Sequence, residues 1–206
     1  MNDGYTEILT SISSSNPTPG GGSVAALILA HAHSLAIMVS RLTIRSEKWA
    51  DGHDTARRII VESQIGVSRS LELANLDAQA FDAVMSAYRM PKQSDDEISL
   101  RKKAIIDATI QAAEVPLHTA QEACSMLHSI GDLSRNCNVN ALTDLASSAE
   151  LANTSVTLAS LNVRINIVSL DNEVSSELSS KIEEATSIAN SRLSDIMGVI
   201  SERLGW

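Results

Sequence analysis

One carboxylate in the sequence lies on an otherwise apolar helical face. Asp77 shares this face with three apolar residues at helical spacing, Phe81, Val84 and Tyr88. A carboxylate among apolar groups must find a partner or take up a proton, which is one route to a general acid or base near neutral pH. A structural ion pair, or a hydrogen bond to a neighbouring helix end, gives the same pattern. Lys92 follows the helix end, where it either binds the last carbonyl groups or binds an anion or donates a proton.

A run of three glycines, Gly20, Gly21 and Gly22, precedes Ser23 and a long apolar segment. Glycine allows backbone conformations with positive φ and leaves the peptide groups unobstructed. The first N–H groups of a helix lack intrahelical partners and the helix dipole is positive there, so the run predicts a site for an anion or a polar ligand edge. In the alternative interpretation these residues only mark the start of a helix that Ser23 caps. The run is not a Walker loop, because no lysine follows it.

Two further polar clusters lie on segments with a helical apolar period. Asn140 and Asp144 are one turn apart and share a face, although helix capping and a favourable first-turn charge are the commoner roles of such residues. Asn162 and Asn166 also share a face, from which Arg164 points away. Two amides late in an apolar helix need buried partners or a ligand to satisfy their donors and acceptors.

Neither the histidines nor the cysteines have the spacing of a metal site. His31 and His33 are two residues apart on a predicted helix and therefore face different ways. Cys124 and Cys137 stand far apart, and we expect both to be reduced thiols in a cytoplasmic protein. No nucleophile elbow marks a serine hydrolase.

The composition favours tightly packed helices. Of the 206 residues, 44% are apolar but only 2% are aromatic, which suits a β-sandwich poorly. The formal net charge of −9 argues against a large nucleic-acid footprint. The apolar stretch 24–39 contains histidines and is shorter than the ~20 residues that a membrane span needs. We therefore expect no membrane association, and a single domain over residues 1–206.

The apolar periodicity predicts an all-α bundle of five or six helices. Ser94 and Glu97 form a predicted capping box at one helix start, and Pro116 predicts a kink in the same helix. Gly66 suggests an irregularity within the preceding helix, which is expected over residues 55–90. The expected helices cover residues 3–14, 23–45, 55–90, 95–129, 139–170 and 174–203, with a loop over 131–138.

Several blocks of the chain together resemble the formimidoyltetrahydrofolate cyclodeaminase family, which includes stand-alone methenyltetrahydrofolate cyclohydrolases. The resemblance spans roughly residues 5–172. The blocks are PTPGGGSVAA (17–26), the stretch from Asp77 to Lys92, EVPL (114–117), NVNALTD (138–144) and LNVRIN (161–166). Cys137 and Val139 depart from the glycine and proline that many members have at these positions.

The resemblance implies an all-α homodimer with a folate site in a cleft near the subunit contact. It also implies one of two reactions. Either 5-formimidoyltetrahydrofolate closes to 5,10-methenyltetrahydrofolate with loss of ammonia, or water opens the methenyl compound to 10-formyltetrahydrofolate. Both need a positioned acid or base and an oriented pterin, and we expect no metal or redox cofactor. Any formiminotransferase is then expected to be a separate protein.

We therefore hypothesise a small cytoplasmic folate enzyme with Asp77 as the acid or base and Lys92 as its partner or as an anchor for the folate carboxylates. The expected substrate-binding residues are Gly20, Gly21, Gly22, Ser23, Asn140, Asp144, Arg164 and Asn166. A non-catalytic folate-binding bundle and a purely structural helical module remain alternatives.

Overall fold

The computed structural model describes residues 4–206, and its regular elements there are all helical, as the sequence predicts. The elements are α1 (Tyr5–Ile12), α2 (Gly21–Ile44), the 3₁₀ helix η1 (Glu47–Gly52), α3 (His53–Tyr88), α4 (Asp95–Asn136), the 3₁₀ helix η2 (Val139–Ala141), α5 (Leu142–Ile167) and α6 (Asn172–Leu204).

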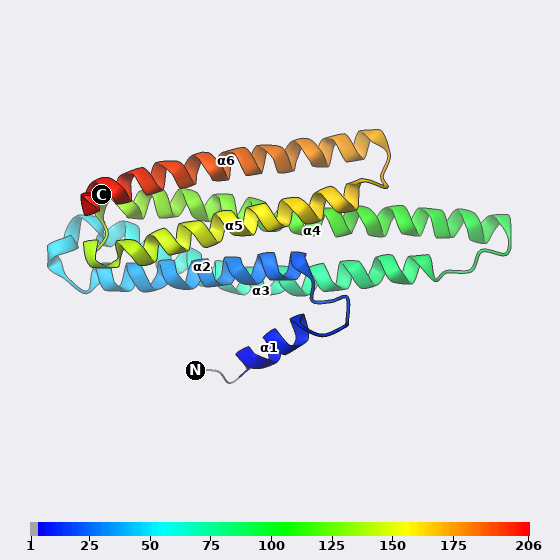
Figure 1. The fold of residues 1–206 in the computed structure, drawn as a ribbon, viewed down its shortest axis with the longest axis horizontal. Helices are drawn as coiled ribbons and strands as arrows, with labels where there is room; N and C mark the ends of the chain where they lie inside the picture. Colours follow the sequence, from blue (N-terminus) through cyan, green and yellow to red (C-terminus); the bar gives the residue numbers. More distant parts are fainter. Residues whose placement is uncertain (1–3) are drawn as a thin grey trace.

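Four long helices, α2 to α5, form an elongated bundle (Figure 1). Helix α2 packs between α3 and α5, and α6 covers the groove between α4 and α5. Helices α3 and α4 extend beyond α2 and α5 as a two-helix arm, on the right in Figure 1. The short α1 lies beside the bundle, where the Tyr5 hydroxyl is 3.2 Å from Nε2 of His31.

Small residues allow the central helices to approach closely. Ala25 and Ala32 of α2 are fully buried, and their backbone carbonyls accept hydrogen bonds from Ser155 and Ser148 of α5 at 2.8 and 2.7 Å. Each hydroxyl thereby gains a partner inside the core, as buried polar groups require. This close packing explains how an alanine-rich chain with few aromatics fills its core.

The predicted loop over 131–138 is wrong for most of its length, because α4 continues to Asn136. Ile130 and Leu133 are buried in the core, and the packing of this turn outweighs the poor helix propensity of Gly131. Arg203 of α6 holds the helix end by donating to the carbonyl oxygens of Ser134 and Cys137 at 2.5 and 2.7 Å. Helix α4 also continues through Pro116.

Local hydrogen bonds between side chains and backbone N–H groups set two other helix starts. The capping box is confirmed: the Ser94 hydroxyl accepts from the Glu97 backbone N–H, and the Glu97 carboxylate accepts from the Ser94 backbone N–H. The segment predicted as one helix over 139–170 divides into η2 and α5. Asn138 caps η2, because its side-chain oxygen accepts from the Asn140 backbone N–H.

Helix α2 has the length and composition of a membrane span, being longer than the apolar stretch expected from the sequence. However, 61% of its most apolar window is buried inside the bundle, as in the core helix of a soluble protein.

Candidate active site

A cavity of about 340 Å³ opens where the N-terminus of α2 meets three other helices. Helices α3, α4 and α5 contribute its remaining walls together with the chain that leads into α2. The lining residues are Pro17, Thr18, Gly20, Gly21, Gly22, Asp77, Phe81, Val84, Ala112, Asn162, Ile165 and Asn166. Its volume lies within the range of small-molecule sites.

Asp77 is half-buried in this cavity, on the apolar face that the sequence predicts. Its Oδ2 accepts a hydrogen bond of 2.9 Å from the hydroxyl of Ser23, which is almost fully buried. The carboxylate lies directly on Gly22, where an added Cβ would stand 2.1 Å from Oδ1. Gly22 is therefore needed for space, since any side chain there would displace the carboxylate.

Burial raises the pKa of Asp77 above its ordinary value, while hydrogen bonds from the side chain and backbone of Ser23 act in the opposite direction. A raised pKa brings a carboxyl group closer to the range in which it exchanges protons at neutral pH. In the described structure the partner of Asp77 is a serine hydroxyl and not a cation. The Asp77 carboxylate therefore bonds to the first turn of a neighbouring helix, one of the arrangements left open by the sequence, and is not part of a structural ion pair.

The glycine run forms the first turn of α2, although without the positive φ that the sequence allows. Gly20 is the N-cap and has extended backbone, and Gly21 and Gly22 are already helical. Within residues 4–206, positive φ occurs only at Gly4 and Gly205. Gly20, the N-cap, has no side chain, and Ser23 lies three residues inside the helix with its hydroxyl bonded to Asp77, so the interpretation in which Ser23 serves only as a cap is wrong. Asp77 binds the backbone of Ser23 in this first turn, and the N–H groups of Gly21 and Gly22 lie beside the cavity.

Two amides on α5 line the opposite wall. Nδ2 of Asn166 donates to the backbone carbonyl of Ala112 at 2.6 Å, and Nδ2 of Asn162 donates to that of Leu158 at 2.8 Å. Within the described residues, the side-chain oxygens of both amides have no recorded partner. The pair therefore leaves hydrogen-bond acceptors for a ligand. Both asparagines share one face in the sequence, but only Asn166 is among the expected substrate-binding residues; the four-residue spacing is the signal that also points to Asn162.

Lys92 and Arg164 do not line this cavity. Lys92 is exposed in the loop after α3, whereas Asp77 lies about 16 Å along the axis from the end of that helix. The carbonyl of Tyr88 at the helix end is instead bound by Arg101, whose Nη2 donates at 3.0 Å. Arg164 is exposed and points away from the two asparagines, as its spacing predicts.

Asn140 and Asp144 lie at the other end of the bundle. The neighbouring Asn138 donates its backbone N–H to the Thr43 hydroxyl, near the C-terminus of α2, at 3.0 Å. Helix α2 separates this region from its glycine run by roughly 30 Å. A single chain therefore does not bring Asn140 and Asp144 together with Asp77, contrary to the expectation of one shared cleft.

Between residues 4 and 206 no group of three or more His, Cys, Asp or Glu is placed to hold a metal ion. Cys124 and Cys137 are free thiols, and burial raises the pKa of Cys124 to about 11.

The fold and the cavity define a class of protein: an all-α bundle with a half-buried acid that bonds to a glycine-rich helix N-terminus. The family model described as formiminotransferase-cyclodeaminase matches residues 4–184. The chain therefore belongs to this family, and the resemblance seen in the sequence is confirmed.

Two relatives and one solved structure illustrate the range of the match. The chain is 30% identical over 202 residues to the methenyltetrahydrofolate cyclohydrolase of Methylorubrum extorquens, covering 98% of this chain and 90% of that protein. It is 32% identical over 172 residues to the formimidoyltransferase-cyclodeaminase of Rattus norvegicus, covering 81% of this chain but 32% of the rat protein. The chain thus spans about a third of the length of that relative.

The structure is similar to that of the formiminotetrahydrofolate cyclodeaminase of Thermotoga maritima, with a TM-score of 0.86 and 25% identity. The match covers 98% of this chain and 96% of that chain.

Proposed function

We propose that this chain is a folate enzyme that converts 5-formimidoyltetrahydrofolate to 5,10-methenyltetrahydrofolate and releases ammonia. The observation that carries the proposal is the position of Asp77, half-buried against Ser23 in a ligand-sized cavity of a formiminotransferase-cyclodeaminase family member. The likeness to the Thermotoga maritima cyclodeaminase over nearly the whole chain supports this choice of reaction.

In this reaction N10 of the folate attacks the carbon of the protonated formimidoyl group and forms a tetrahedral carbon that carries N5, N10 and the departing amine. The Asp77 carboxylate takes the proton that N10 loses. It then returns a proton to the amine, and the carbon–nitrogen bond to the amine breaks as ammonia leaves. One group performs both transfers when its pKa lies close to the working pH, which the burial of Asp77 favours.

The free acceptors of Asn162 and Asn166 suit the donor edge of a pterin, which carries an amino group and a lactam N–H. The first turn of α2 supplies N–H donors on the other side. In this proposal the folate is the substrate and not a bound cofactor, and no resident metal or redox cofactor takes part.

Asp77→Asn tests the proposal, with Asp82→Asn as a matched control on an exposed position of the same helix. The measurement is the appearance of the methenyltetrahydrofolate chromophore from 5-formimidoyltetrahydrofolate. We expect a loss of about 10²–10⁴-fold for Asp77→Asn, because it cannot transfer a proton, and little change for Asp82→Asn. Full turnover by folded Asp77→Asn protein would refute the assignment of Asp77.

The second candidate is a methenyltetrahydrofolate cyclohydrolase, in which Asp77 takes a proton from water. The match to the Methylorubrum extorquens protein over 90% of its length favours it. Enzyme-dependent loss of preformed methenyltetrahydrofolate, without activity on the formimidoyl compound, would select this reaction. Folate-induced stabilisation without turnover in either assay would instead indicate a non-catalytic binding protein.

We further propose that the protein is a cytoplasmic homodimer that receives its substrate from a separate formiminotransferase. The dimer is supported by the exposed apolar side chains Leu161, Ile165 and Val168 at the C-terminal end of α5. Light scattering after gel filtration should give twice the 22.0 kDa chain mass. Ile165→Glu should give monomers, whereas Val61→Glu, at an exposed position of α3, should leave the dimer intact.

A further inference from the structure

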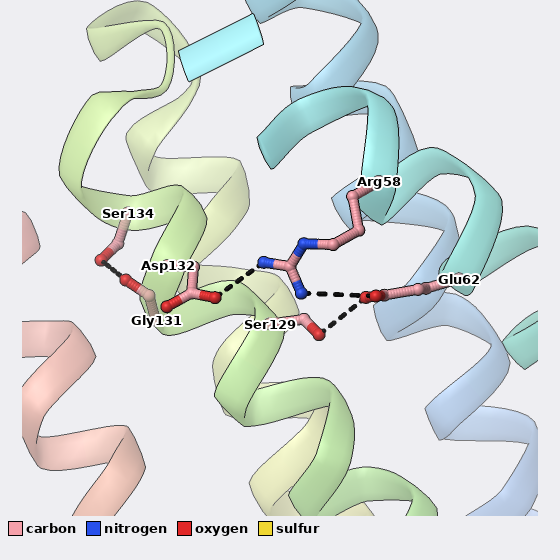
Figure 2. A network of polar contacts seen from close by, with 6 residues as sticks. All are labelled: Arg58, Glu62, Ser129, Gly131, Asp132 and Ser134. Atoms are coloured by element: carbon pink, nitrogen blue, oxygen red, sulfur yellow. Dashed lines mark hydrogen bonds and ion pairs between the residues drawn. The ribbon is translucent and has the colours of Figure 1, made fainter. Parts of the chain in front are cut away.

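The carboxylate of Asp77 has no cation to balance its charge. Other carboxylates of α3 and α4 do: Figure 2 shows Arg58 donating to Asp132 at 2.7 Å and to Glu62 at 3.3 Å. Asp77 forms no ion pair within residues 4–206, and no Lys, Arg or His lines its cavity. A carboxylate removed from water is normally paired. The lining of this cavity therefore carries one formal charge, which is negative.

The N-terminus of α2 offsets only part of this charge. Its free N–H groups carry about half an elementary positive charge, whereas an ionised carboxylate carries a full negative one. A carboxylate accepts about four hydrogen bonds, so the bonds from the hydroxyl and backbone of Ser23 leave acceptor sites unused. The polar side-chain atoms that are both unpartnered and sealed from solvent in residues 4–206 do not include Oδ1 of Asp77. This oxygen is therefore open to the cavity.

The two asparagines add further acceptors to the same cavity. Their Nδ2 groups already donate to backbone carbonyls, and their side-chain oxygens are likewise unpartnered without being sealed from solvent. Asn162 lies against Gly21, where an added Cβ would stand 3.3 Å from its Nδ2 and 3.7 Å from its Oδ1. Gly21 precedes Gly22, on which the Asp77 carboxylate lies. A carboxylate of α3 and an amide of α5 thus flank one turn of α2.

The rest of the lining specifies the body of an occupant. Phe81 lies one turn after Asp77 on α3 and is 37% exposed, and Val84 and Ile165 extend this apolar surface. An occupant that complements the cavity is positively charged, donates hydrogen bonds and has an apolar, planar body. An amidinium group meets these requirements, because it is planar, delocalises its charge and presents N–H donors to a carboxylate as a guanidinium does.

We propose that the Asp77 cavity selects ligands that carry an amidinium cation, with the Asp77 carboxylate as the anchor of the charged group. The inference rests on the proposed function and specifies the form of its substrate, which is the protonated formimidoyl group. A cation beside Asp77 favours the ionised carboxylate that the first proton transfer requires.

The charge of the ligand is conserved in the proposed reaction. The bond from N10 to the formimidoyl carbon forms, and the bond from that carbon to the amine nitrogen breaks. The proton of N10 leaves with the amine as neutral ammonia, and the positive charge remains on the methenyl product. Asp77 therefore has a cation beside it at the start and at the end of the reaction.

The test uses benzamidine and benzamide, two probes of the same shape of which only the first is a cation at pH 7. Isothermal titration calorimetry of the full chain gives the dissociation constant of each probe without any folate. We expect benzamidine to bind at one site per chain, about tenfold or more tightly than benzamide, because its hydrogen bonds to the carboxylate are charged on both sides. Asp77→Asn should remove this preference, and Asp77→Ser serves if the asparagine variant does not fold. Asp82→Asn, at an exposed position of α3, should retain it.

The proposal is overturned if benzamide binds as tightly as benzamidine, if benzamidine shows no saturable binding up to its solubility limit, or if the folded Asp77 variant keeps the preference. Turnover of 5-formimidoyltetrahydrofolate by a protein that does not prefer benzamidine would refute this inference and leave the proposed function standing. A preference for benzamidine that depends on Asp77, in a protein without turnover, would support the inference and refute the proposed function.

Discussion

The carboxylate of Asp77 occupies the space that a side chain at position 22 would need, 2.1 Å from the position of an added Cβ. A second close contact of this kind joins the same two helices, where the ring of His33 lies on Gly66. The two contacts lie three turns apart, as the antiparallel course of α2 and α3 requires. In both, a polar side chain of one helix is placed by a glycine of the other.

Gly22→Ala should therefore damage the site more than the fold. The new methyl group forces the Asp77 carboxylate away from Ser23, and we expect turnover to fall by about tenfold or more, equivalent to about 1.4 kcal/mol in the barrier. Gly198→Ala is the matched control, because nothing lies within 4 Å of its added Cβ in α6. It should leave turnover unchanged and stabilise the protein by about 0.5–1 kcal/mol. Equal turnover in the two variants would contradict this account of Gly22.

Ser23→Ala should change the pH dependence of the reaction. The Ser23 hydroxyl lowers the pKa of Asp77 against the effect of burial, so its loss moves the acidic limb of the rate profile to higher pH. The measurement is kcat/KM as a function of pH. Ser40→Ala removes an equally buried hydroxyl that has no recorded partner within the described residues, and it should leave the profile in place. An unmoved profile in Ser23→Ala would count against Asp77 as the titrating group.

Asp77 should also make folding stability depend on pH. Its pKa is raised in the folded state, so the folded protein holds this proton more tightly than the unfolded chain does. This stabilisation is fully present below pH 3.8, the ordinary pKa of the aspartate side chain, and is lost as the pH rises through the raised pKa of the folded state. Urea unfolding across this window should show the free energy of unfolding falling with pH relative to Asp77→Asn. The opposite slope would mean that the folded-state pKa is lowered.

Arg203→Ala should destabilise the end of α4. The guanidinium donates to the carbonyl oxygens of Ser134 and Cys137, and the substitution leaves both oxygens without this hydrogen bond at the helix end. We expect a loss of about 1–3 kcal/mol in chemical denaturation. Lys181→Ala removes an exposed cation of the same helix, paired with Glu177, and should cost no more than about 0.5 kcal/mol. Similar losses in both variants would show that Arg203 has no special role.

Much of the secondary structure could be predicted because its causes are local. The capping box at Ser94 and Glu97 and the apolar period of α5 act between residues close in the chain. The prediction of a loop over 131–138 was wrong because Ile130, Leu133 and Arg203 stabilise the last turns of α4 through contacts with distant segments.

For the site, the sequence by itself determined the types of residue and their local faces: Asp77 among apolar residues, a glycine run before Ser23, and two asparagines one turn apart. Only the tertiary structure decided which of these meet. It brought Asp77, Asn162 and Asn166 to one cavity with Ser23 buried behind Asp77, and it placed Asn140 and Asp144 at the far end of α2. The physical reason is that helical periodicity fixes the face of the helix on which a side chain lies. The axial register of two packed helices, which decides which residues become neighbours, depends instead on how their small residues and glycines interlock.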